Sequence, residues 1–274
     1  MMSQGSVLGL DVGCSPTRRS SAVCRLDWDE QHVKWSIARF RAVEPDRTEA
    51  ITRVAGRMPL AAAAFDGPLR RGLDVIGRYR AAERMLTRQL QAFTGKPGQA
   101  STPVGKLLNE HANLNVAAVL EHCDLALARH HVAVHEKAVV EAFPSSFLGV
   151  MIEAPKALNA RRSDRSDIFF QFLAGAEVLQ RLIAYCLPGR LMSQHPSAVT
   201  NHDDRAALVC ALTALCVAAR DYTAAGDEDG WIILPPSSFV QGWAMDALRA
   251  NAAGERGPAL HIETGEHGSS YVDA

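Results

Sequence analysis

The order of apolar and polar positions in the first quarter of the chain predicts three strands, a helix and a fourth strand. Residues 7–12 (VLGLDV) are nearly all apolar, as expected for a strand buried on both faces. Residues 21–28 and 33–41 mix apolar and polar positions, which is typical of more exposed antiparallel strands. Turn-forming segments separate these strands. A helix over 44–58 and a strand over 59–65 follow.

The remaining pattern predicts mostly helices, with two further strands and one strand-like patch. The segment TGKPGQASTP is the clearest loop. We expect helices over 74–94, 115–129, 163–186, 202–222 and 240–250, strands over 137–142 and 231–236, and the patch at 259–263. This organisation predicts one α/β domain over residues 1–250 and a polar C-terminal tail over 251–274.

Acidic residues stand where several of these elements begin or end. Asp11 follows an apolar strand, Asp66 follows another, Glu141 closes AVV, and Asp203 and Asp204 open the most apolar helix. A carboxylate at the end of a buried strand is costly unless it is paired, hydrogen-bonded or bound to a cation. Helical crossovers return strands parallel to the first, so we expect the strand-end acids at one sheet edge, covered by the helix start.

Carboxylates gathered in this way repel one another, and divalent cations relieve the repulsion. Ligands that are all oxygen suit Mg²⁺ or Mn²⁺. Two such ions about 4 Å apart can activate water and stabilise the leaving oxygen of a phosphodiester. The set therefore predicts metal-dependent hydrolysis, with nucleic acid as the candidate substrate.

Four sequence blocks resemble one known family. In chain order they are VLGLDVG, AFDGPL with RYRAAERML, VVEAFPSSF and HDDRAALVCALTA. Together they resemble the DUF429 family, and the resemblance runs from about residue 7 to about residue 236. It implies a ribonuclease H-like mixed sheet, with three antiparallel strands followed by parallel strands and helices on both faces. It also implies a metal-dependent nuclease site at Asp11, Asp66, Glu141 and an acid near position 203. Family members often carry Asp where this chain has Ala206, so the fourth acid is expected at Asp203 or Asp204.

Each acid also has a structural interpretation. Asp11 and Asp66 both precede glycine-containing turns, where aspartate is common. Glu141 is harder to explain as structure, because an apolar residue would pack better there. Asn201 is a good helix N-cap, and Asp204 then falls at the third helical position of a capping box. For Asp203 and Asp204, cap and ligand therefore both stand as interpretations, and one residue could do each job.

Basic residues offer two interpretations as well. A phosphate groove and a solvated helix face, the commoner case, both fit one group of arginines: 70, 71, 78, 80, 84 and 88. The histidines at 130, 131 and 135 have no fourth zinc ligand at suitable spacing and are expected at the surface. His202, beside the acids, is a candidate for an accessory role.

Composition limits the class of protein. The formal net charge of −1 provides no global basic field that would recruit nucleic acid nonspecifically. The six cysteines form no CxxC pair and are expected to be reduced thiols. No signal peptide and no membrane-spanning stretch are evident, so a cytoplasmic protein without a membrane partner is expected.

Two other functions compete with the nuclease. Residues 9–27 resemble the first phosphate loop of actin- and hexokinase-type kinases and ATPases, where Asp-x-Gly precedes a hairpin. Those proteins need a second glycine-rich phosphate loop, and no convincing one follows in this chain. A non-catalytic binding protein that retains the fold is the third hypothesis, and Ala206 and the near-neutral charge are compatible with it.

Overall fold

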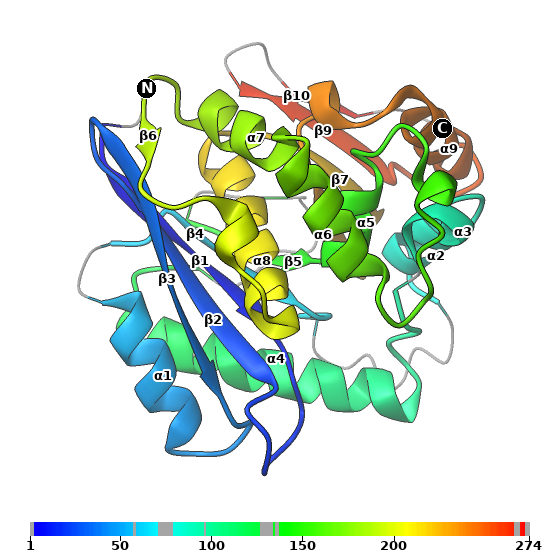
Figure 1. Ribbon diagram of the computed structural model, residues 1–274. Helices are drawn as coiled ribbons and strands as arrows, with labels where there is room; N and C mark the ends of the chain where they lie inside the picture. The colour runs from blue at the N-terminus through cyan, green and yellow to red at the C-terminus, as the bar shows by residue number, and fades with distance from the viewer. Residues whose placement is uncertain are drawn as a thin grey trace.

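The structure is a computed structural model, and it describes residues 3–56, 59–70, 79–95, 97–126, 134, 137–265 and 269–271. The described strands form one mixed sheet, with helices on both faces (Figure 1). The strands are β1 (Gly5–Asp11), β2 (Ser21–Trp28), β3 (His32–Phe40), β4 (Ala62–Asp66), β5 (Val139–Ala142), β6 (Leu191–Met192), β7 (Asp221–Asp227), β8 (Gly230–Leu234), β9 (Leu260–Thr264) and β10 (Ser269–Tyr271). The α-helices are α1 (Asp46–Ala55), α2 (Ala81–Thr87), α3 (Gln91–Thr94), α4 (Pro103–His122), α5 (Pro144–Gly149), α6 (Arg165–Gly175), α7 (Val178–Cys186), α8 (His202–Ala218) and α9 (Gly242–Ala252).

The sheet has the strand order β10-β9-β7-β8-β5-β4-β1-β2-β3-β6. Strands β1, β2 and β3 are mutually antiparallel neighbours, whereas β4 lies parallel to β1 and β5 lies parallel to β4. Three antiparallel strands followed by parallel strands were expected, and this part of the prediction is confirmed. The carboxyl ends of β1, β4 and β5 consequently share one edge of the sheet.

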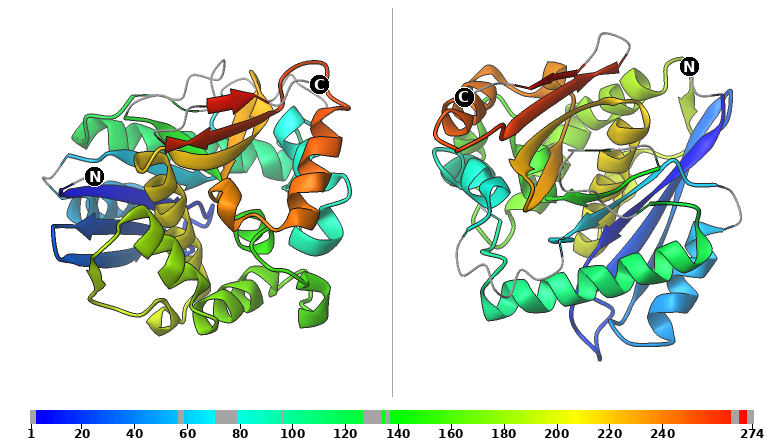
Figure 2. Two further views of the ribbon diagram at one scale, coloured as in Figure 1. Left: turned by 90° about the horizontal axis from the view of Figure 1, so that it is seen from above. Right: turned by 180° about the vertical axis from the view of Figure 1, so that it is seen from behind.

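Alternation along the strands separates two cores. Val7 of β1, Ala64 of β4 and Val140 of β5 face the core under α8, which also includes side chains of α5, α6 and α7. Leu8 and Phe65 face the opposite core, under α1 and α4. Helices α2 and α9 belong to a third cluster with β7, β8 and β9. Figure 2 shows α4 lying across the side of the sheet opposite α8.

Helix α8 approaches β1 unusually closely. A Cβ atom added to Gly9 would lie 2.0 Å from the backbone nitrogen of Ala211 and 2.3 Å from the carbonyl oxygen of Ala207. Only glycine in the strand and small residues on the helix permit this distance. Nearly every α8 residue after the first turn is buried, so this helix forms the centre of the larger core.

The predicted helices differ from the observed ones at their ends and at internal breaks. The helix expected over 163–186 is two helices, α6 and α7, because Glu177 has a left-handed backbone conformation (φ 59°). The helix expected over 202–222 ends at Ala218, and Arg220 (φ 56°) turns the chain into β7, a strand that the sequence pattern did not predict.

Two further helices also differ from their predictions. The helix expected over 74–94 is represented by α2 and α3, separated at Gln89 (φ 59°), and residues 71–78 lie outside the described part. Helix α4 begins at Pro103, well before the expected start at 115, and the Thr102 hydroxyl accepts a hydrogen bond from Gly105 N at 3.1 Å.

Residues 251–274, expected to form a polar tail, contribute to the sheet. The strand-like patch forms β9, which pairs with β7 along its whole length, and β10 pairs with β9. In the described part of the chain, no single helix is long and apolar enough to cross a membrane; one bent pair, α6 with α7, passes by length and composition.

Candidate functional site

One row of residues runs across the carboxyl edge of the sheet. Asp11 pairs with Ala22 of β2, and Ala22 pairs with Arg39 of β3. On the other side, Leu10 pairs with Phe65, so the next residue of β4, Asp66, lies beside Asp11. Residues in one row of a sheet point to one face. Asp66 and Asp11 therefore lie side by side on the α8 face, as expected, with Arg39 two strands away. We call these two aspartates the carboxylate row.

The first turn of α8 brings two more carboxylates to this row. Gly9 contacts the backbone of α8 at Ala207, and Asp203 lies one helical turn before Ala207. From Gly9 to Asp11 the strand advances by about 7 Å, and from Ala207 back to Asp203 the helix advances by about 6 Å. Because these two distances are similar, Asp203 lies over Asp11. Asp204 points toward β3, where its Oδ1 atom lies 3.5 Å from Arg39 Nε.

The N-cap of α8 is Asn201, as predicted. Its side-chain oxygen accepts hydrogen bonds from Asp203 N at 3.0 Å and Asp204 N at 3.2 Å. Asp204 Oδ1 is buried and has no hydrogen-bond partner among the described residues. The capping role therefore belongs to Asn201, and both carboxylates remain available to the site.

Burial and mutual repulsion change the acidity of these groups. Burial, followed by the charges of Asp66, Asp203 and Asp204, raises the pKa of Asp11 well above its usual range. Burial raises the pKa of Asp66 to about 7, and the charge of His202 opposes this. Burial also raises the pKa of Asp204, with Arg39 opposing and Asp203 adding to the effect. The cluster thus holds protons that a cation would displace.

Glu141 lies on the other face of the sheet. In the register of β4 with β5, Glu141 pairs with Phe65, while Asp66 pairs with Ala142. This offset of one residue directs the Glu141 side chain away from α8. There it is buried, receives hydrogen bonds from Arg80 Nη1 at 2.8 and 2.9 Å, and accepts another from Leu69 N at 2.8 Å. The structure does not bring Glu141 together with Asp11 and Asp66.

The Glu141 network joins two glutamates to Arg80 and braces the loop after β4. Arg80 Nε also donates to Glu83 Oε1 at 2.9 Å, and Glu83 Oε1 accepts from Ala100 N at 3.0 Å. Because Leu69 N binds Glu141, the network fixes the chain three residues after Asp66. Its position supports a structural role behind the site.

His202 joins the site through a partner that the sequence did not indicate. Its Nδ1 atom lies 3.0 Å from Asp167 Oδ2 on α6, and Asp167 Oδ1 accepts from Arg205 Nη1 at 3.0 Å. Since a carboxylate only accepts, Nδ1 is the donor and Nε2 is left with its lone pair when the ring is neutral. Ala206 is buried and lines a cavity of about 10 Å³ together with these three residues.

The predicted arginine groove is not assembled as an open basic surface in the described residues. Arg70 pairs with Asp229, and Arg84 and Arg88 both pair with Glu255. Arg80 is buried with Glu83 and Glu141. The arginines at 71 and 78 and the histidines at 130, 131 and 135 lie outside the described part of the chain.

The carboxylate oxygens of this site suit a hard cation, but few of them are already arranged around one point. Within the described residues, no group of three or more His, Cys, Asp or Glu side chains is arranged to hold a metal ion. Mg²⁺ commonly takes only one or two carboxylates and completes its shell with water and substrate oxygens. Asp11 and Asp66 fit that pattern. Burial and these two carboxylates raise the pKa of the nearby Cys210 thiol, so it stays protonated.

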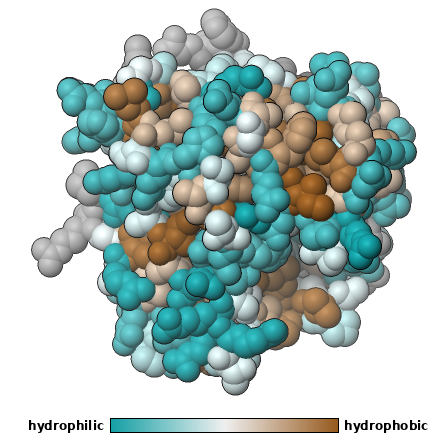
Figure 3. Space-filling model, viewed as in Figure 1, coloured by the Kyte–Doolittle hydropathy of each residue, from teal (hydrophilic) through white to brown (hydrophobic). Residues whose placement is uncertain are grey.

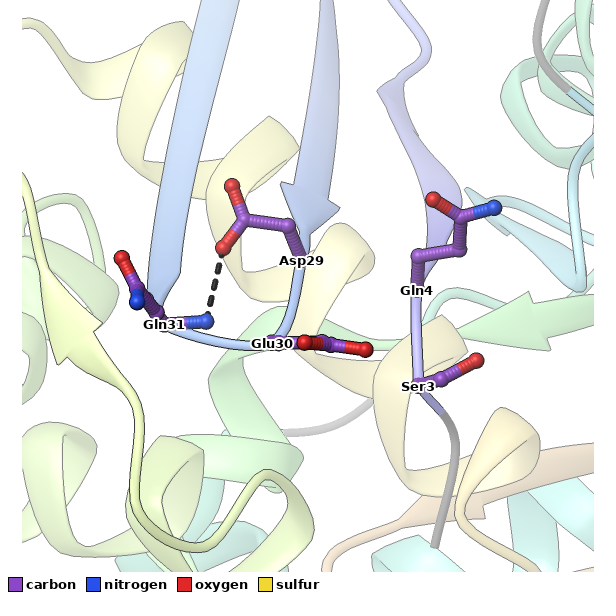
Figure 4. A pocket seen from close by; sticks show the side chains of 5 residues that line it. All are labelled: Ser3, Gln4, Asp29, Glu30 and Gln31. Atoms are coloured by element: carbon purple, nitrogen blue, oxygen red, sulfur yellow. Dashed lines mark hydrogen bonds between the residues drawn. The ribbon is translucent and has the colours of Figure 1, made fainter.

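A cavity of about 440 Å³ lies elsewhere, at the end of the sheet where β1 begins (Figure 4). Ser3 and Gln4 precede β1, and residues 29–31 form the β2–β3 turn. The Asp29 carboxylate accepts a hydrogen bond from Gln31 N at 2.8 Å and so shapes this turn. This cavity is separate from the carboxylate row, which lies at the carboxyl end of β1.

Comparison with protein-family models, curated proteins and solved structures finds no match to this chain. The resemblance noted in the sequence therefore stays a prediction. Sequence reasoning missed Arg39 and Asp167. Arg39 could have been found by extending the strand register from Asp11 across the hairpin, whereas Asp167 carries no local motif.

Proposed function

We propose that this protein is a Mg²⁺- or Mn²⁺-dependent hydrolase that cleaves phosphodiester bonds of nucleic acid. The observation that carries the proposal is the row of Asp66 and Asp11 under the acidic first turn of α8. Asp203 and Asp204 raise the pKa of Asp11 after burial and Asp66. Among the described residues, the positive charges near these acids come from Arg39, which pairs with Asp204, and from His202, whose charge acts on Asp66.

The topology supports a ribonuclease H-like assignment within the same proposal. Strands β3, β2, β1, β4 and β5 are consecutive in the sheet, with the first three antiparallel and the last two parallel to β1. This is the arrangement that the resemblance to the DUF429 family implies. Fold alone does not fix function, so the weight of the proposal rests on the carboxylates.

Asp11 and Asp66 would hold the cation, with Asp203 as the nearest further carboxylate. When bound, the ion supplies positive charge that stabilises the charge developing on the phosphodiester oxygens. Asp11 and Asp66 sit on adjacent parallel strands and are rigidly positioned by the sheet. Helix α8 covers the row and limits the access of bulk water, because it packs directly on Gly9.

His202 is the residue of this chain best placed to move a proton. Asp167 fixes its ring through Nδ1, which leaves Nε2 free to accept a proton from water or to return one to the leaving oxygen. The effect of its charge on Asp66 indicates that it lies close to the carboxylate row. In this scheme Glu141 is a brace, through Leu69 and Arg80, and takes no part in the chemistry.

The test is cleavage of labelled single-stranded DNA, duplex DNA and RNA by purified protein with Mg²⁺ or Mn²⁺. We expect cleavage of at least one substrate, loss of cleavage with EDTA, and loss in Asp11→Asn and Asp66→Asn. Asp246→Asn is the matched control, because Asp246 is exposed on α9, away from the site. Absence of cleavage in all conditions, or full activity of Asp11→Asn, would refute the proposal. Stabilisation by Mg-ATP without cleavage would favour the kinase or ATPase alternative.

A further inference from the structure

The contact of Arg39 with Asp204 leaves most of its guanidinium group without a hydrogen bond to the described residues. Arg39 lies in the same row and on the same face as Asp11, separated from it by Ala22. Two strand spacings place the Arg39 backbone about 10 Å from that of Asp11. The guanidinium side chain is 45% exposed, and its contact with Asp204 is an ion pair at 3.5 Å with no hydrogen bond.

The neighbouring Arg41 shows what a structural arginine at this edge looks like. Arg41 Nε donates to Asp46 Oδ2 at 2.7 Å and Nη2 donates to Asp46 Oδ1 at 3.2 Å, so one edge of its guanidinium makes a bidentate pair. Asp46 also accepts a hydrogen bond from Arg41 N and thereby closes the turn before α1. Arg39, with its single long contact, keeps most of its donors for another anion.

The β1–β2 loop extends this cationic edge. Ser15 O accepts a hydrogen bond from Ala42 N at 2.9 Å, which fastens the loop beside the end of β3. The Ser15 hydroxyl accepts from Arg18 N at 3.0 Å, so the loop is folded back on itself. Arg18 and Arg19 are exposed on its outer side, and the charge of Arg19 reaches Asp46. The β1–β2 loop lies at the bottom of the molecule in Figure 1, and Figure 3 shows mostly hydrophilic residues in that region.

We propose that Arg18, Arg19 and Arg39 form a cationic rim that binds the phosphate backbone of a polynucleotide whose neighbouring phosphate lies at the carboxylate row. This inference rests on the proposed function for its substrate class. The rim draws its arginines from β3 and from the β1–β2 loop, so its positive charge extends beyond the Arg39–Asp204 pair at the carboxylate row. The rim therefore suits a polymer with successive phosphates better than a mononucleotide.

The experiment measures binding separately from cleavage. A fluorescently labelled single-stranded oligonucleotide is titrated with protein in EDTA, and its anisotropy gives the dissociation constant at several salt concentrations. Each phosphate contact on a single strand contributes about 0.7 to the slope of log K against log salt. We expect Arg18→Gln/Arg19→Gln/Arg39→Gln to reduce the slope by about 2, and Arg18→Gln/Arg19→Gln alone to reduce it by about 1.4.

Two exposed arginines at the far edge of the sheet provide the control. Arg249→Gln/Arg256→Gln removes two positive charges near α9 and should leave the slope unchanged. The double loop variant leaves the Arg39–Asp204 pair intact, so its effect does not depend on any disturbance of α8. Equal losses in the loop and control variants would overturn the rim, since they would indicate a general charge effect.

The outcomes separate the rim from the nuclease. Slope changes confined to the rim variants support the rim even if no cleavage is ever detected. Cleavage by the wild type with unchanged binding by all rim variants overturns the rim and leaves the nuclease standing. Binding of the wild type to vesicles of anionic phospholipid, with none to oligonucleotides, would also overturn it.

Discussion

Replacing Asp66 by Asn tests whether the carboxylate row stores unfavourable electrostatic energy. The carboxyl group of Asp66 lies beside Asp11 and is partly buried under α8. Burial raises the pKa of Asp66 from its ordinary 3.8 to about 7. Asparagine keeps the shape of the side chain and removes its ionisation. The substitution should therefore stabilise the metal-free protein at alkaline pH, although it is expected to abolish activity.

The size of the effect follows from the pKa. Between about pH 4 and about pH 7 the folded chain binds more protons at Asp66 than the unfolded chain, so the free energy of unfolding falls as pH rises. Each pKa unit corresponds to about 1.4 kcal/mol, and a difference of about 3 amounts to about 4 kcal/mol. This is an upper limit, because the side chain keeps some contact with water. Above about pH 7 the loss is complete.

Urea unfolding, followed by the fluorescence of the four tryptophans, measures this difference. We would compare wild type, Asp66→Asn and the exposed control Asp246→Asn in EDTA at pH 5 and pH 8. The Asp66→Asn variant should gain stability relative to wild type between pH 5 and pH 8, by about 1–3 kcal/mol, because part of the effect is already present at pH 5. The control should stay within about 0.5 kcal/mol of wild type at both pH values.

Two results would refute the reasoning. If Asp66→Asn is less stable than wild type at pH 8, the carboxylate makes favourable contacts that the structure does not contain. If the difference between variant and wild type is the same at pH 5 and pH 8, the carboxyl group titrates in its ordinary range and the row is not under electrostatic strain.

Three further predictions concern the supports of the site. Gly9→Ala should displace α8, because the new Cβ would lie 2.0 Å from Ala211 N. We expect the free energy of unfolding in urea to fall by about 1–3 kcal/mol and the thermal shift with Mn²⁺ to become smaller. Wild-type values for both would contradict the close packing. Glu141→Ala should lower the free energy of unfolding by about 3 kcal/mol, because it leaves Arg80 partly unpaired. Glu141→Gln should keep the thermal shift with Mn²⁺, and loss of that shift would indicate that Glu141 is a metal ligand. Asn201→Ala should lower stability by about 1 kcal/mol through the lost cap, and an unchanged melting temperature would argue against it.

Much of the fold could be predicted because its rules are local or topological. Apolar runs and turn segments identified β1 to β4, and the crossover through α1 required β4 to lie parallel to β1. With β1 and β4 taken as neighbours, that rule placed Asp66 beside Asp11. The cap at Asn201 was predictable from residue type and position.

The face on which Glu141 lies was not predictable from the sequence alone. Side chains alternate along a strand, so a register difference of one residue between β4 and β5 sends Glu141 to the opposite face from Asp66. Strand register depends on packing between elements that are far apart in the chain. A carboxylate in an apolar strand can equally belong to a buried ion pair, and here Arg80 supplies it.

The missed strand β7 and the broken helices share one cause. Arg220, Gln89 and Glu177 adopt left-handed backbone conformations without being glycine or asparagine, so no local signal marks the ends of the helices. Strand β7 continues the apolar character of α8 and is defined by its pairing with β8 and β9. Tertiary pairing overrides local preference in this part of the chain.

The contact between Gly9 and α8 makes the carboxylate row a late product of synthesis and folding. The β1–β4 pair can form early, with Asp11 and Asp66 open to water and fully ionised. The row becomes covered only when α8, from the last third of the chain, docks on Gly9. Because contacts between distant segments form slowly, a nascent or truncated chain that ends before α8 would present two solvated aspartates and no enclosed site. A chain of this kind would carry Asp11 and Asp66 yet lack the enclosed site until α8, with Asp203 and Asp204, emerges from the ribosome.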